Sequence, residues 1–144
     1  MAQSHLLHLL TSLNLGGTEV FAEGLVRGLD PGRFRVTVAY VKARGMVADR
    51  LESAGVEVVR LDTPGQIVRF IRSRGVRLLH THLYRANQYG RLAGRMAGIP
   101  AISSQRSVDD WRRPWHHWLD RATARWTAAI VANAEAVKRM LLER

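Results

Sequence analysis

Two adjacent glycines, Gly16 and Gly17, precede Thr18 and Glu19 and stand between the apolar run 5–11 and the amphipathic run 20–29. A strand, a glycine loop and a helix opening at Thr18 would bring free backbone N–H groups and the positive end of a helix dipole to one point. This arrangement predicts a binding site for an anion, typically phosphate. The alternative is an ordinary strand-to-helix turn with Thr18 as N-cap, because the pair is not a full Gly-x-Gly-x-x-Gly pattern.

His80 and His82 are the residues that could suggest a metal site. They are two positions apart, so in a strand they lie on the same face. A third ligand is not evident in the sequence, and we therefore predict no metal site. His80 is expected to be a hydrogen-bonded core histidine, and His82, at the end of its strand, is the better candidate for a binding residue.

The tryptophans are concentrated in one short segment. All four fall within residues 111–126, a segment that also carries Arg112, Arg113, Arg121 and Arg125. Helical spacing of Trp115, Trp118 and Trp126 favours a stripe that packs on the sheet. The alternative is a membrane-interface or lipid-acceptor surface, because tryptophan and arginine both suit the depth of lipid headgroups. Trp111 precedes Pro114 and is expected outside the helix, exposed near a cleft.

Composition narrows the class of protein. The 144 residues are 47% hydrophobic, enough for a core, and contain no cysteine, which excludes disulfides and thiolate metal sites. The net charge of +10 favours anionic partners, although an arginine excess can also reflect the base composition of a genome. No apolar run approaches the length of a membrane span. We therefore expect a cytoplasmic protein, with peripheral contact to the inner face of the membrane as the alternative.

Strand-like and helix-like segments alternate along the whole chain. Strands are predicted at 5–11, 34–41, 56–61, 76–81, 100–104 and 128–132. Helices are predicted at 18–29, 46–54, 64–74, 84–97, 114–126 and 133–142. Several strands lack alternation, as expected where helices cover both faces of a parallel sheet. The prediction is one α/β domain, residues 1–144, with a doubly wound, mostly parallel sheet that binds ligands at the carboxyl ends of its strands.

Four segments, in this order of elements, together indicate a resemblance to a known family of enzymes. They are Gly16-Gly17-Thr18-Glu19, Leu78-Leu79-His80-Thr81-His82, Gly98-Ile99-Pro100 and the stretch from Ala128 to Val137. The chain resembles, over nearly its whole length, the N-terminal domain of the group 1 (family 4) glycosyltransferases of GT-B architecture. The resemblance implies a Rossmann-like, acceptor-side domain. It also implies that the C-terminal domain, which binds most of the nucleotide sugar, is absent from this chain, so that the chain alone is inactive.

The resemblance also assigns roles to individual residues. Gly16, Gly17 and Thr18 would hold the phosphates of the donor and stabilise the departing diphosphate. Residues expected to line the acceptor side of the cleft are Glu19, His82, Tyr84, Arg85, Asn87, Arg106 and Trp111. Many relatives place a histidine after the fifth strand to contact the transferred sugar. This sequence has Arg106 there, which suggests a guanidinium that contacts phosphate or a charged acceptor.

The function that these expectations favour is a retaining glycosyltransferase that moves a sugar from a nucleotide-sugar donor to a glycan or lipid-linked acceptor of a cell-envelope polysaccharide. The nucleotide sugar is a co-substrate and no cofactor is expected; no catalytic residue is assigned. A nicotinamide oxidoreductase is disfavoured because the glycine fingerprint is missing and the second strand ends in Lys42 rather than an acid. The alternative is a non-catalytic basic module that binds a membrane surface or nucleic acid, although no nucleic-acid-binding motif is present.

Overall fold

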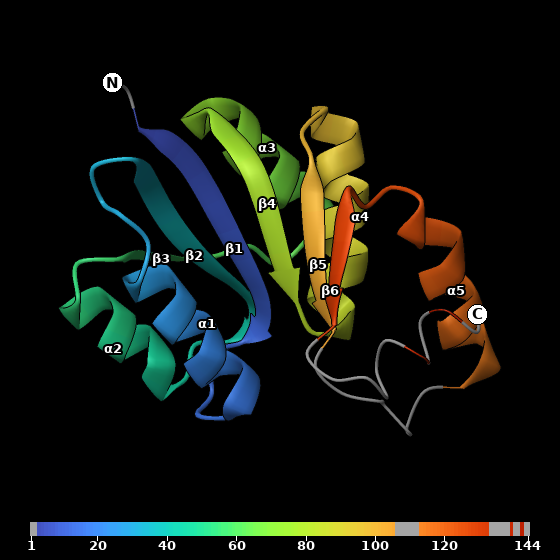
Figure 1. The fold of residues 1–144 in the computed structure, drawn as a ribbon, viewed down its shortest axis with the longest axis horizontal. Coiled ribbons are helices and arrows are strands. Elements are labelled where there is room, and N and C mark those ends of the chain that lie inside the picture. The colour runs from blue at the N-terminus through green and yellow to red at the C-terminus, as the bar shows by residue number, and fades with distance from the viewer. Residues whose placement is uncertain (1–2, 106–112, 133–138, 140–141, 143–144) are drawn as a thin grey trace.

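The computed structural model describes residues 3–105, 113–132, 139 and 142, and within them a six-stranded sheet flanked by helices (Figure 1). The strands are β1 (Ser4–Ser12), β2 (Phe34–Ala43), β3 (Glu57–Arg60), β4 (Val76–His82), β5 (Ala101–Gln105) and β6 (Ala129–Ala132). The helices are α1 (Gly17–Arg27), α2 (Met46–Ser53), α3 (Pro64–Arg74), α4 (Tyr84–Ala97) and α5 (Pro114–Ala124). All neighbouring strands are parallel, in the order β3-β2-β1-β4-β5-β6.

Two hydrophobic clusters lie on the two faces of this sheet. One packs α3 and α4 against the odd-numbered residues of the central strands, including Leu7, Leu9 and Leu79. The other packs α1 and α2 against the opposite face, at Leu10 and Val38. The doubly wound α/β fold predicted from the sequence is therefore confirmed, and the sheet is entirely parallel.

Most predicted elements match the structure within one to three residues, and α3 and α4 match at both ends. The predicted start of the first helix is wrong. The helix begins at Gly17, with Gly16 rather than Thr18 as N-cap, because Gly16 has an extended backbone and its carbonyl accepts the first helical hydrogen bond, from the Val20 N–H at 3.0 Å. The predicted helix 133–142 lies largely outside the described residues.

Helix α4 lies very close to the sheet because it carries glycines on its inner face. A Cβ on Gly90 would come within 2.1 Å of Cγ2 of Thr81, so α4 could not pack at this distance with any larger residue there. A Cβ on Gly94 would lie 3.2 Å from Cβ of Ala101, a tight but less severe contact. This packing fixes the position of the N-terminal turn of α4 at the carboxyl edge of the sheet.

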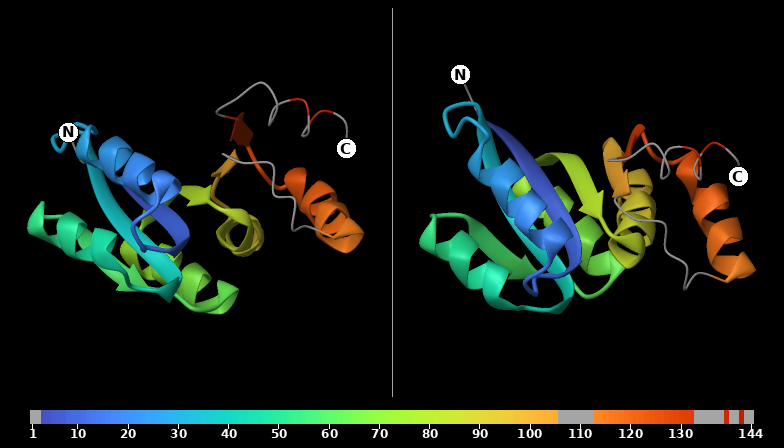
Figure 2. Two further views of the ribbon diagram at one scale, coloured as in Figure 1. Left: turned by 90° about the horizontal axis from the view of Figure 1, so that it is seen from below. Right: turned by 60° about the horizontal axis from the view of Figure 1, so that its bottom comes forward.

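Helix α5 corrects the prediction that the tryptophan stripe packs on the sheet. Its buried residues are polar, Asp120 and Thr123, and they face α4. The side chains of Trp115 and Trp118 are 58% and 70% exposed. Figure 2 shows, from two further sides, that α5 lies at the end of the molecule opposite to α2. A polar interface thus holds this helix, with Trp115 and Trp118 exposed. Trp126, just after the helix, is half-buried, and Arg95 of α4 lies over its ring at 5.4 Å.

A search for membrane-spanning helices among the described residues finds none that has the necessary length and apolarity.

Candidate functional site

The carboxyl ends of the strands, at the bottom of Figure 1, bring together the N-termini of α1 and α4. Gly16, the N-cap of α1, has no side chain that could cap the first amides of the helix. A Cβ on Gly17 would meet no atom within 4 Å, so the backbone is open to an approaching group there. The first amides of α1 together with the helix dipole therefore form a concentration of positive potential suited to phosphate.

Glu19 folds back over this N-terminus. Its Oε2 lies 2.6 Å from the position that a Cβ would occupy on Gly16. A carboxylate in the first turn of a helix interacts favourably with the helix dipole. A phosphate bound at this place would compete with the same carboxylate, so Glu19 must turn aside when an anion enters.

The N-terminus of α4 is built differently. Its N-cap, Leu83, has φ +76° and ψ 156°, a combination that is almost restricted to glycine. Thr11, near the end of β1, accepts a hydrogen bond from the Ala86 N–H at 3.3 Å and so satisfies one amide of the first turn. The two central strands and α4 are therefore tied together at the edge where the site is expected.

A cavity of about 610 Å³ opens between these elements and α5. It is lined by Thr11, Lys42, Leu83, Tyr84, Arg85, Gln88, Tyr89, Trp115, His116 and Leu119. Lys42 at the end of β2 and Arg85 in the first turn of α4 supply positive charge, and three aromatic side chains supply flat apolar surface. The hydroxyl of Tyr84 donates to the His116 carbonyl at 3.1 Å, which connects α4 with α5 across the cavity. Such a wall can hold an anionic group and a sugar ring or apolar chain together.

A second hollow, of about 510 Å³, lies at the opposite edge of the sheet, near Gln3, Phe34 and Val56. These residues lie at or near the starts of strands, whereas ligands of open parallel sheets bind at the carboxyl ends. We therefore place the candidate site at the 610 Å³ cavity.

The structure distributes the predicted acceptor residues over three environments. Tyr84 and Arg85 line the cavity. His82 and Asn87 are fully buried and do not line it: Asn87 accepts a hydrogen bond from the Thr81 hydroxyl at 2.7 Å, on the α4 face of the sheet. Arg106 and Trp111 lie outside the described residues. The roles expected for these residues in acceptor binding stay predictions.

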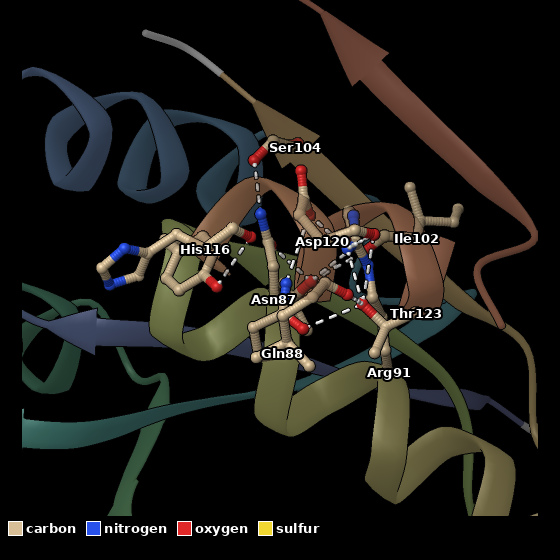
Figure 3. Close-up of polar contacts among 12 residues, drawn as sticks. Asn87, Gln88, Arg91, Ile102, Ser104, His116, Asp120 and Thr123 are labelled. Carbon is tan, nitrogen blue, oxygen red and sulfur yellow. Dashed lines mark hydrogen bonds and ion pairs between the residues drawn. The ribbon is translucent and has the colours of Figure 1, made fainter. Parts of the chain in front are cut away.

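Behind the cavity, a buried polar network joins α4 to α5 (Figure 3). The Arg91 guanidinium, 2% exposed, donates through Nη1 to Asp120 Oδ1 at 2.5 Å and to Thr123 Oγ1 at 3.2 Å. Its Nε donates to Ser103 Oγ at 3.2 Å, and Gln88 Nε2 donates to Asp120 Oδ1 at the same distance. The network fixes α5, and with it Trp115 and His116, relative to the sheet.

The structure corrects the expectation that His80 and His82 have no third histidine, or other ligand, beside them. His80 and His82 do have a third partner, His8 on the adjacent strand β1, which pairs with β4 in register His8 to His80. His8 Nδ1 lies 3.2 Å from His82 Nε2. Burial lowers the pKa of His8 to about 3, with a further contribution from nearby His80, and burial alone lowers the pKa of His80 to about 4. The hydrogen bond expected for His80 is present, from Nε2 to Ser104 Oγ at 2.7 Å.

Sequence reasoning missed several of these residues. The available signal for Lys42 was its place near the carboxyl end of a buried strand, where side chains of neighbouring strands meet. His8 sits in the middle of an apolar strand, and nothing local indicates that its strand neighbours the one with His80. The sequence predicts Arg91 to be an ordinary exposed arginine of a helix, whereas the tertiary structure shows it to be buried.

Comparison with known proteins gives one family and several structural neighbours. The family model of Glycosyltransferase Family 4 matches residues 15–144. The search among curated proteins finds no match. The fold is similar to crystal structures of Anabaena HepE in complex with UDP (TM-score 0.81, 18% identity, 96% of this chain) and in complex with UDP and glucose (TM-score 0.73, 19% identity, 96% of this chain). It is also similar to Acinetobacter baumannii MurG (TM-score 0.72, 13% identity, 93% of this chain).

These identities are low, so the likeness concerns the fold alone. The chain spans 40% of the HepE chain and 42% of the MurG chain.

Proposed function

The chain belongs to glycosyltransferase family 4, and from this premise we propose that it forms the acceptor-side half of a retaining enzyme that transfers a sugar from a nucleotide-sugar donor to a glycan or lipid-linked acceptor. The observation that carries the proposal is the N-terminus of α1 at the carboxyl end of β1, with Gly16 as N-cap and free space beside Gly17; the Glu19 carboxylate, which folds over Gly16, would turn aside for the phosphate. A site of this form binds the group that must leave in the reaction, the diphosphate of the donor.

Support for a nucleotide-sugar donor comes from the neighbour of similar fold. HepE was crystallised with UDP and with UDP and glucose. In this chain the amides of the first turn of α1 would donate to the departing phosphate oxygens. Negative charge develops on those oxygens as the bond to the sugar breaks, so fixed donors stabilise the transition state more than the ground state. The reaction needs no cofactor of the protein in this proposal.

The acceptor is assigned to the cavity of about 610 Å³ between α4 and α5, which Thr11 near the end of β1 also lines. Lys42 and Arg85 suit an acceptor with an anionic group, such as the phosphate of a lipid-linked sugar. Tyr84, Tyr89 and Trp115 suit the apolar faces of a sugar or a lipid chain. We propose a role in cell-envelope polysaccharide synthesis, in the cytoplasm or at the inner face of the membrane, on this combination of charge and aromatic surface.

The chain alone is expected not to turn over a nucleotide sugar, because a GT-B cleft closes between two domains and binds most of the donor on the second. The measurement is release of nucleoside diphosphate from a panel of nucleotide sugars by residues 1–144 and by the full-length protein. Turnover by residues 1–144 would contradict the proposal that a second domain is needed to bind the donor and close the cleft.

Gly17→Val in the full-length enzyme tests the phosphate site. We expect kcat to fall by about 10²-fold or more, because the branched side chain covers the first amides of α1, on the scale of losing an oxyanion-type donor. The fold should persist, because a Cβ added at this position meets no atom within 4 Å and leaves room for the side chain. Steady-state kinetics and thermal unfolding of the variant provide the two readouts.

Gly24→Ala is the matched control. Gly24 lies in the same helix, and its added Cβ likewise meets nothing within 4 Å. This variant should keep wild-type kinetics. If Gly17→Val is folded and as active as Gly24→Ala, the glycine pair is only a turn and does not bind the phosphates of the donor.

A further inference from the structure

Three of the six histidines of the chain lie together on the face of the sheet that carries α1 and α2. His8 shares this face with Leu10, because side chains alternate along a strand, and His80 and His82 extend from the adjacent strand β4. The ring centroids of His80 and His82 are 4.3 Å apart, and those of His8 and His80 are 5.0 Å apart. One ring nitrogen from each of the three histidines lies within 4.8 Å of the others.

The distance between two of the nitrogens matches that between ligands of one metal ion, and the third nitrogen lies within 4.8 Å of both. His8 Nδ1 and His82 Nε2 are 3.2 Å apart. Two nitrogens that each bind one zinc ion at about 2.0–2.1 Å in tetrahedral geometry are separated by nearly the same distance. The site therefore needs little rearrangement to hold a metal between these two side chains.

The surroundings shield the cluster from water. His8 and His82 are 2% and 0% exposed, so an ion held between them would be enclosed by protein. The contact between His80 Nε2 and Ser104 Oγ can hold the ring in position, as outer-shell hydrogen bonds do for metal-ligating histidines. His80 is only half-buried, so an ion can enter from its side.

We propose that His8, His80 and His82 bind a divalent cation of borderline softness, for which Zn²⁺ is the best match. Three imidazoles with no carboxylate among them suit zinc rather than magnesium or calcium, which prefer oxygen. Three protein ligands leave a fourth position for water. The ion would join β1 to β4 at the centre of the sheet. The proposal is independent of sugar transfer, and it is tested by metal binding alone.

Zinc titration of the purified, chelator-treated full-length protein by calorimetry at pH 7.5 tests the site. We expect one zinc ion per chain, a visible absorption spectrum with Co²⁺ as the probe, and a higher melting temperature with zinc than without. His80→Gln should abolish these effects. Ser104→Ala, which keeps all three ligands, should weaken affinity by about tenfold or more. His80 is the substitution of choice because its side chain is the least buried of the three.

His117→Gln is the control, because it removes a histidine of α5 that is not part of the cluster. It should bind zinc as the wild type does. The proposal is overturned if the wild type binds no better than a folded His80→Gln variant. It is also overturned if the binding is lost in His117→Gln and kept in His80→Gln, since the ion would then sit elsewhere. Circular dichroism of each variant establishes that it is folded.

Discussion

At the scale of single residues, Leu83 carries backbone strain at the edge of the candidate site. Its φ of +76° with ψ 156° places a branched side chain in a region that costs on the order of 1–3 kcal/mol for residues other than glycine. The strained residue directly follows His82 and lines the cavity. Strain of this kind persists only where surrounding contacts impose it, here the junction between a buried strand and the first turn of α4.

Replacement of Leu83 by glycine and by alanine measures this strain. Both variants lose the leucine side chain, but only glycine relaxes the backbone. We therefore expect Leu83→Gly to be more stable than Leu83→Ala by about 1–3 kcal/mol, measured by urea unfolding.

Arg113 provides the matched control, because it is the N-cap of α5 and has an ordinary extended backbone with φ −85°. Glycine is preferred over alanine at any N-cap, by about 1 kcal/mol. The difference between the glycine and alanine variants at Arg113 gives this ordinary preference. An equal difference at Leu83 would mean that the backbone there is not strained.

At the scale of elements, α5 depends on polar rather than apolar packing. Its buried side chains, Asp120 and Thr123, meet Arg91 of α4, and the Arg91–Asp120 pair is almost completely removed from water (Figure 3). Removal of one partner leaves an uncompensated buried charge, whereas removal of both leaves none. The orientation of the cavity wall made by Trp115 and His116 therefore rests on a charge pair.

Asp120→Ala is expected to destabilise the protein by about 3–5 kcal/mol, because the Arg91 guanidinium then stays buried without its carboxylate. The double variant Arg91→Met/Asp120→Leu should recover a large part of this loss. The measurement is the free energy of unfolding in urea for the two variants and the wild type.

The control for this pair is Arg44→Ala. Arg44 makes exposed ion pairs with Asp49 and Glu52, and such pairs contribute about 0–1 kcal/mol. A loss in Asp120→Ala no larger than that in Arg44→Ala would mean that the buried pair does not hold α5.

At the scale of the whole molecule, the positive charge and the exposed aromatic rings coincide on α5. The chain has a net charge of +10, and Arg113, Arg121 and Arg125 are exposed beside Trp115 and Trp118. Aromatic rings flanked by arginines suit the headgroup region of an anionic bilayer. This surface adjoins the 610 Å³ cavity through Trp115, so a membrane bound here would present a lipid-linked molecule to the proposed acceptor site.

Co-sedimentation of the full-length protein with liposomes tests this contact. We expect binding to vesicles with anionic lipid and little binding to neutral vesicles. Each arginine near an anionic surface contributes about 1 kcal/mol, so Arg121→Glu/Arg125→Glu should weaken binding at least about tenfold. Trp115→Ser/Trp118→Ser should weaken it on both kinds of vesicle.

Arg69→Glu/Arg77→Glu has the same net charge as the first variant and serves as its control. These two exposed arginines belong to α3 and β4, away from α5. Equal weakening by the two charge reversals would indicate attraction by net charge alone. Absence of the wild type from the vesicle pellet at low salt would rule out the contact.

The sequence by itself determined the fold class, the number of strands and their succession along the chain, and the glycine loop after β1. These features follow from local information: apolar periodicity, the length of each run, and glycine and proline at the ends of elements. The first turn of α1 was predicted one residue late, because the extended backbone that makes Gly16 the N-cap is visible only in the structure.

Only the tertiary structure decided which side chains meet. His8 and His82 are 74 positions apart, and they are in contact because the strand order places β4 beside β1 in one particular register. The tryptophan stripe has the spacing of a buried face, yet Trp115 and Trp118 are exposed because Asp120 and Thr123 find partners on α4. Periodicity predicts that a helix has two faces, but the groups on the neighbouring element decide which of them is buried.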